Sequence, residues 1–243
     1  MGRGKKEEEL IVYGIHPVEE FLRTQPQRAT ELVVRTESMK NVRFLVDEAT
    51  RSGIPVRILK GKDFLRIAKG RPFQGIFLRM SPFEYIDIEE VISRKKPLVA
   101  LDGITDPQNF GSILRSAAFF GVGGVIIPKD RSVRVTPAVI KASAGAAARV
   151  PIVRVVNLAR TLEEIKSSGY WVIGSSSHQG ESLDTFSPPV PYVLVLGSEG
   201  SGLRRLVLRA CDVLVRIPGA TESLNVAVAG AVLLYGLKRN ESL

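Results

Sequence analysis

Three polar segments of the chain contain residue types that can bind a ligand or take part in catalysis. The first, residues 102–116, holds Asn109 and, six residues later, Arg115. Asn109 lies near the start of an expected helix and is a residue type that caps helices. The long side chain of Arg115 can return toward that helix start. A helix cap plus a surface arginine is the alternative interpretation, and this segment alone favours neither.

The second segment, LGSEGSG at positions 196–202, combines three glycines and two serines with Glu199. Glycines at a strand-to-helix turn allow the backbone to approach a ligand closely. The carboxylate of Glu199 can accept a hydrogen bond from a sugar hydroxyl or pair with an arginine. A tight turn without a ligand is the alternative. The spacing matches neither the G-x-G-x-x-G dinucleotide fingerprint nor a P-loop.

The third segment, residues 217–225, offers Thr221, Ser223 or Asn225 as the cap of the last helix. All three segments follow apolar stretches typical of buried strands. In open α/β sheets, ligands bind beyond the carboxyl ends of the strands. Three polar segments at three such ends predict one shared site. Around His178 no Gly-x-Ser-x-Gly elbow is present, so a serine hydrolase site is not supported.

Composition restricts the class of protein. The formal net charge of +9 over 243 residues favours a polyanionic partner, with nucleic acid first, although a basic surface without a partner is the alternative. Residues 40–80 and 129–160 are rich in Lys and Arg. One cysteine and two histidines argue against a disulfide framework and against a metal site. The charged stretch before Leu10 reads as a polar tail without a signal peptide, so we expect a reducing, cytoplasmic setting.

The order of apolar stretches predicts an α/β fold with two domains. Residues 1–80 read as a small α/β domain, residues 81–96 as a linker and residues 97–243 as a second domain. In the second domain, continuous apolar strands alternate with helices, which indicates a mostly parallel sheet covered on both faces. The expected strands there are residues 98–102, 124–128, 152–155, 171–175, 192–197 and 213–217. The expected helices are residues 111–120, 137–147, 158–168, 203–211 and 224–238.

The three segments together resemble the signature motifs of the SpoU branch of the SPOUT RNA methyltransferases. The matching residues are Asn109, Gly111, Arg115 and Ser116, then LGSEGSGL at 196–203, then Ile217-Pro218 and SLNV at 223–226. The N-terminal part, with YGIHPVEEFL at 13–22 and QGIFLRM at 74–80, resembles the RNA-binding domain of a subgroup that 2′-O-methylates a guanosine of large-subunit (23S) ribosomal RNA. The sequence departs from the usual patterns at Gly219, within a shorter third segment, and at Phe73.

The resemblance implies a catalytic domain with a deep trefoil knot, a homodimer through that domain and S-adenosylmethionine as the cofactor. By motif position, the cofactor-binding residues are Leu196, Gly197, Ser198, Ile217 and Leu224. The catalytic residues are Arg115, Asn109, Glu199, Ser223 and Asn225, and no metal is needed. Family mechanisms make the residue at position 115 the base. Because a guanidinium is normally always charged, electrostatic stabilisation is the other interpretation.

We expect the N-terminal domain to bind structured RNA through its basic residues, including Arg43, Arg51, Arg57, Lys60 and Lys62. Three alternatives stay open at this point. The chain is compatible with a transfer-RNA guanosine 2′-O-methyltransferase, with a resistance-type enzyme that modifies adenosine in ribosomal RNA, and with a non-enzymatic RNA-binding protein. A nucleotide-dependent oxidoreductase is disfavoured because the sequence lacks a dinucleotide fingerprint.

Overall fold

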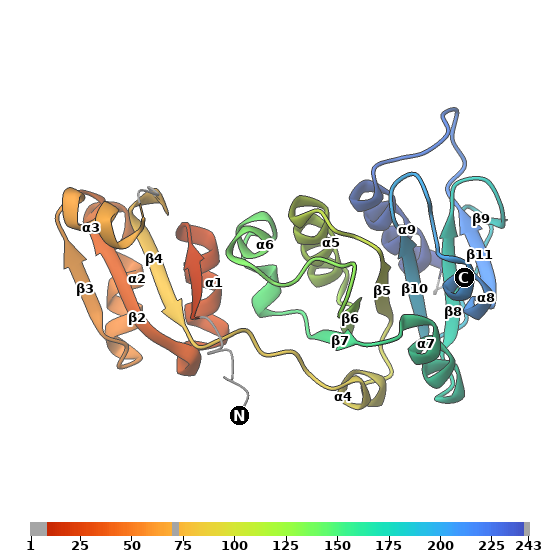
Figure 1. Ribbon diagram of the computed structural model, residues 1–243, viewed down its shortest axis with the longest axis horizontal. Helices are drawn as coiled ribbons and strands as arrows, with labels where there is room; N and C mark the ends of the chain where they lie inside the picture. Colours follow the sequence, from red (N-terminus) through yellow and green to blue (C-terminus); the bar gives the residue numbers. More distant parts are fainter. Residues whose placement is uncertain (1–8, 70–72, 241–243) are drawn as a thin grey trace, which may run out of the picture. The chain divides into compact units, whose positions relative to one another are not determined.

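The computed structural model describes residues 9–69 and 73–240, so most of the predicted polar tail lies outside the described residues. The chain divides into two compact units (Figure 1). Unit 1 comprises residues 1–84 and 135–149, and unit 2 comprises residues 85–134 and 150–243. In the described part of the chain, no helix is both long enough and apolar enough to cross a membrane.

Unit 1 is built on a mixed four-stranded sheet with the strand order β1-β4-β2-β3. Strand β4 pairs antiparallel with β1 and β2, whereas β2 and β3 are parallel. Buried side chains such as Phe21, Leu45 and Phe64 pack the helices against this sheet. The elements are β1 (Leu10–Tyr13), α1 (Ile15–Thr24), β2 (Ala29–Arg35), α2 (Met39–Arg51), β3 (Val56–Leu59), α3 (Gly61–Ile67) and β4 (Ile76–Met80).

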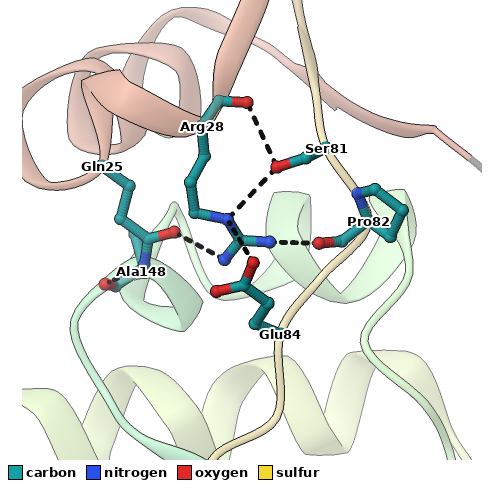
Figure 2. A network of polar contacts seen from close by, with 6 residues as sticks. All are labelled: Gln25, Arg28, Ser81, Pro82, Glu84 and Ala148. Atoms are coloured by element: carbon teal, nitrogen blue, oxygen red, sulfur yellow. Dashed lines mark hydrogen bonds and ion pairs between the residues drawn. The ribbon is translucent and has the colours of Figure 1, made fainter.

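A buried arginine ties two loops of unit 1 together (Figure 2). The Arg28 side chain is only 11% exposed and donates to the Ser81 hydroxyl, to the Gln25 side chain at 3.1 Å and to the carbonyl of Pro82. Its Nε lies 3.9 Å from the Glu84 carboxylate. The first residues of the predicted linker therefore belong to unit 1. The remainder of the linker forms α4 (Ile88–Ser93), whose Val91 is buried in unit 2.

In unit 2, the described residues form a seven-stranded parallel sheet with the order β7-β6-β5-β10-β8-β11-β9. Strands β5, β6 and β10 are buried at every position, as expected for a sheet covered on both faces. The strands are β5 (Leu98–Asp102), β6 (Gly124–Pro128), β7 (Ile152–Val155), β8 (Trp171–Ser176), β9 (Glu181–Ser182), β10 (Tyr192–Gly197) and β11 (Val213–Arg216).

Helices cover the two faces of this sheet. On one face, α4, α7 (Leu158–Ser167) and α8 (Arg205–Ala210) pack against a cluster that includes Leu98, Ala100 and Val193. On the other, α5 (Pro107–Phe120) and α9 (Val226–Asn240) pack against each other. Gly230 allows α9 to approach β10, because a Cβ at this position would lie 2.8 Å from the Leu196 side chain.

Two of the expected helices are wrong in extent. The predicted helix 137–147 is instead α6 (Pro137–Ala142) followed by a separate 3-10 turn (Ala146–Ala148). Ala144 and Gly145 interrupt it, since both have positive φ angles. The predicted helix 111–120 begins four residues earlier, at Pro107. The cap is Asp106, whose carboxylate accepts from the backbone N–H of Gln108 and Asn109, so the prediction that Asn109 caps this helix is wrong.

Candidate active site at three strand ends

The three polar segments begin at the carboxyl ends of β5, β10 and β11. Gly197, the last residue of β10, pairs with Asp102, the last residue of β5, so the first two segments start side by side. Strand β8 lies between β10 and β11. The third segment therefore has to cross the end of β8 to reach the other two, and the chain between Ile217 and Asn225 provides that length.

Side chains from all three segments meet at one carboxylate oxygen. Glu199 Oε1 accepts from Asn109 Nδ2 at 3.1 Å and from Asn225 Nδ2 at 2.7 Å. The same Asn225 Nδ2 donates to Asn109 Oδ1 at 2.9 Å. The backbone N–H of Val226 points at Glu199 Oε1 from 3.4 Å. The predicted convergence of Asn109, Glu199 and Asn225 is therefore present in the structure.

The start of helix α9 fixes the orientation of this cluster. Asn225 Oδ1 accepts from the backbone N–H of Ala227 at 3.0 Å and of Val228 at 3.3 Å, so Asn225 is the cap among the three predicted candidates. Since that oxygen faces the helix, the amide nitrogen of Asn225 must face Glu199 and Asn109. The same logic leaves Asn109 with its oxygen toward Asn225 and its nitrogen toward Glu199.

The loop that carries Glu199 is a closed turn. The backbones of Ser198 and Gly202 exchange two hydrogen bonds, of 3.1 and 2.9 Å, and the Ser198 and Ser201 hydroxyl oxygens lie 2.6 Å apart. A Cβ at Gly197 would lie 2.4 Å from the carbonyl carbon of Gly202, so the fold of the turn requires glycine at 197. At Gly200 and Gly219 a Cβ would meet nothing within 4 Å, which leaves the backbone of both loops open to a ligand.

The remaining predicted site residues lie on the same elements without joining the cluster. Arg115 is exposed on α5, and Ser223 is exposed in the third segment; neither forms a hydrogen bond or an ion pair with the residues that the structure describes. Leu196 and Gly197 are buried, Ser198 and Ile217 are half-buried, and Leu224 is 46% exposed. Sequence reasoning missed Asp102 and Asp106. An aspartate at the end of an apolar strand and an aspartate before Pro107 were the available signals.

The five predicted RNA-binding residues are all exposed on unit 1, and none of them lies in unit 2. Arg51 forms an ion pair with Glu48 at 2.5 Å, and Arg57 lies 3.9 Å from Glu31. Arg43, Lys60 and Lys62 form no ion pair within residues 9–69 and 73–240, so their charge is available to a phosphate.

The described residues contain neither a group of metal-ligating side chains nor a reactive thiol. No group of three or more His, Cys, Asp or Glu side chains there could hold a metal ion. Burial raises the pKa of the Cys211 thiol to about 12, which keeps it protonated and unreactive at neutral pH. Cys211, the residue after α8, is partly buried and packs against the core cluster of unit 2.

Comparison with known proteins decides the family. A model described as the SpoU rRNA Methylase family matches residues 96–235, and one described as RNA 2′-O ribose methyltransferase substrate binding matches residues 11–86. The chain belongs to the SpoU methylase family. It is therefore an RNA 2′-O-methyltransferase, and SpoU methyltransferases bind S-adenosylmethionine.

Similar proteins cover nearly the whole chain. The 23S rRNA (guanosine-2′-O-)-methyltransferase RlmB of Coxiella burnetii is 40% identical over 237 residues, 94% of each chain. A protein of Mycobacterium sp. (strain KMS) described as an uncharacterized tRNA/rRNA methyltransferase is 40% identical over 97% of this chain and 78% of its own. The SpoU methyltransferase AviRb of Streptomyces viridochromogenes, solved with AdoMet, shares the fold, with a TM-score of 0.80 and 24% identity over 95% of this chain and 90% of its own.

The residues at the three strand ends fit this cofactor. S-Adenosylmethionine supplies an activated methyl group and needs a pocket that binds it through hydrogen bonds and apolar contact. The open backbone at Gly200 and Gly219 and the half-exposed Leu224 side chain offer both kinds of contact. A metal ion is not required to activate a sulfonium methyl.

Replacing the amide donor of Asn225 by an acceptor tests the hydrogen-bond geometry of the cluster. In Asn225→Asp, the new carboxylate still accepts from Ala227 and Val228 but can no longer donate to Asn109 and Glu199, and it faces the Glu199 carboxylate. We expect a loss of about 1–3 kcal/mol in unfolding free energy, measured by urea denaturation.

The double variant Asn225→Asp/Glu199→Gln provides the control. Its neutral amide removes the repulsion between the two carboxylates at 199 and 225, so part of the stability should return. A double variant less stable than Asn225→Asp alone would contradict the hydrogen-bond assignment.

Proposed function

We propose that this protein transfers the methyl group of S-adenosylmethionine to the 2′-oxygen of a guanosine in 23S ribosomal RNA. The observation that carries the proposal is the cluster of Asn109, Glu199 and Asn225, which joins three loops at one edge of the sheet. Identity of 40% to an RlmB protein, over 94% of both chains, favours the guanosine and the ribosomal substrate. The alternative is a transfer-RNA guanosine, since other relatives are described only as tRNA/rRNA methyltransferases.

The proposed reaction forms a bond between the ribose 2′-oxygen and the methyl carbon and breaks the bond between that carbon and sulfur. The hydroxyl proton leaves to solvent or to a base. Arg115, with its free guanidinium, holds an RNA phosphate and stabilises negative charge on the 2′-oxygen. Removal of the proton by Arg115 itself is the alternative. Asn109 and Glu199 orient the ribose or Arg115, and Ser223 and Asn225 hold the RNA or the cofactor.

We assign the cofactor to the backbone and side chains around the second and third segments, at Leu196, Gly197, Ser198, Ile217 and Leu224. The closed turn at 198–202 supports this assignment because it leaves a fixed, open stretch of backbone next to β10. The family's deep trefoil knot remains a proposal. It is supported by the return of the third segment to Glu199 before α9 packs on β10. An experimental structure in which the chain of the catalytic domain forms no knot would contradict this proposal.

We propose residues 1–80 as the RNA-binding domain, residues 81–96 as the linker and residues 97–243 as the catalytic domain. The exposed basic residues of unit 1 and the substrate-binding family match at 11–86 support this division of labour. Counterion release by Arg43, Arg51, Arg57, Lys60 and Lys62 would provide affinity without reading bases. For an enzyme that acts on ribosomal RNA, we propose the cytoplasm as the location.

We also propose a homodimer through the catalytic domain. Phe119 on α5 is 81% exposed and Tyr235 on α9 is 58% exposed, and aromatic side chains of this size on a surface mark interaction sites. Arg115 precedes Phe119 by one helical turn, so the two side chains share a face of α5. Pairing through this face would place Arg115 beside the interface.

Removing the guanidinium tests the role of Arg115. We expect Arg115→Ala to lower kcat for RNA methylation by about 100-fold or more while the Kd for S-adenosylmethionine, measured by calorimetry, stays within about twofold. Arg160→Ala removes an exposed helical arginine elsewhere in unit 2 and should leave both values unchanged. Wild-type turnover by Arg115→Ala would contradict the catalytic role assigned to Arg115.

Neutralising two unpaired lysines tests the RNA-binding surface. Lys60→Ala/Lys62→Ala should weaken RNA binding and reduce the slope of log K against log salt by about one for each phosphate that is no longer neutralised. The matched control, Arg160→Ala/Arg209→Ala, removes the same charge from unit 2. Equal reductions in affinity for the two variants would show that net charge alone sets the affinity.

Charged residues in the aromatic patch test the dimer. We expect the wild-type protein to sediment as a dimer and Phe119→Lys/Tyr235→Lys as a monomer, because two ammonium groups would be buried without partners. Val156→Lys alters an equally exposed apolar position, 75% exposed, and should leave the dimer intact. A monomeric wild-type protein would contradict the proposal.

A further inference from the structure

A buried carboxylate lies directly beneath the loop that carries Glu199. Asp102 is the last residue of β5 and has no exposed surface. Its Oδ2 accepts from the backbone N–H of Arg204 at 2.7 Å, and its Oδ1 accepts from Arg204 Nε at 2.6 Å and Nη2 at 2.5 Å. A buried charge is tolerated only when it is paired and hydrogen-bonded, and Arg204 satisfies both oxygens.

This pair closes the base of the loop. One end of the loop, Gly197, is fixed by its pairing with Asp102 in the sheet. The other end, Arg204, is fixed by the Asp102 side chain. Between them, the two hydrogen bonds of Ser198 with Gly202 close the turn. The residue that ends β5 therefore holds both ends of the segment that presents Glu199.

We propose that Asp102 and Arg204 are positioning residues for methyl transfer. Together they hold the turn at 198–202 in the conformation that binds the cofactor and keeps Glu199 against Asn109 and Asn225. This inference rests on the proposed function. The positioning role depends on the guanidinium of Arg204, because its planar pair of donors fixes the orientation of the two side chains, whereas a single ammonium group does not.

The ion pair is buried at Asp102, whereas the Arg204 side chain is 45% exposed. Removing Arg204 leaves a buried carboxylate without its partner and destabilises the fold, whereas removing both charges restores much of the stability. Stability and positioning can therefore be separated. The double variant Asp102→Asn/Arg204→Met lacks the ion pair without retaining an unpaired buried charge, although the new amide side chain at position 102 can still accept from the backbone N–H of residue 204. Arg205→Met is the matched control, since Arg205 is the adjacent exposed arginine and pairs with no described residue.

The experiment compares Arg204→Met, Arg204→Lys, the double variant and Arg205→Met with the wild type. The measurements are Tm, the Kd for S-adenosylmethionine by calorimetry, the RNA Kd, and amide hydrogen exchange of residues 197–204 without cofactor. We expect Arg204→Met to lower Tm and to raise the cofactor Kd by about tenfold or more, the effect of removing hydrogen bonds to a charged group. Arg204→Lys should lie between Arg204→Met and the wild type.

The double variant decides the question. We expect its Tm to return toward wild type while its cofactor Kd stays raised, its loop amides exchange faster and its RNA Kd stays unchanged. Recovery of cofactor affinity together with Tm, or unaltered exchange in the loop, would overturn the positioning role. A wild-type protein that binds no S-adenosylmethionine would instead contradict the proposed function. In that case, the hydrogen exchange of residues 197–204 would still test whether Asp102 and Arg204 hold the loop.

Discussion

One oxygen atom, Oε1 of Glu199, connects the three loops of the candidate active site. Two side-chain amides and a backbone N–H converge on it, and they come from segments far from Glu199 in sequence. A carboxylate is well suited to this position because it can accept several hydrogen bonds and offers no donor that would compete. The charged acceptor also strengthens each bond relative to a neutral one. Without this contact, the three loops would share an edge of the sheet but not a defined geometry.

The parallel sheet makes that contact possible. Because β5, β10 and β11 run in the same direction, the segments after them emerge at one edge, and the register of Gly197 with Asp102 brings the first two together. The cap of α9 then fixes the position of the third segment. Asn225 uses its oxygen for the helix and its nitrogen for Glu199, so the start of the last helix and the shape of the site depend on the same side chain.

Sequence patterns were sufficient for the strands and for the grouping of the three loops, because buried parallel strands are continuous apolar runs. They were insufficient where a choice depended on neighbours in space. The cap of α5 is a different case, because Pro107 at the first helical position is a local signal for Asp106 that the sequence prediction overlooked. Thr221, Ser223 and Asn225 were equivalent candidates until the start of α9 at Val226 distinguished them. The short strand β9 and the pairing of Asp102 with Arg204 depend on contacts that no local pattern encodes.

In the proposed reaction, the methyl group of S-adenosylmethionine meets a ribose 2′-oxygen at the Glu199 cluster. The most direct measurement is nucleoside mass spectrometry of 23S ribosomal RNA and transfer RNA after incubation with the purified protein and isotope-labelled S-adenosylmethionine. We expect label in 2′-O-methylguanosine from 23S ribosomal RNA with the wild-type protein, and none with Glu199→Ala. Label on a base, or undiminished ribose methylation by Glu199→Ala, would contradict the proposed reaction.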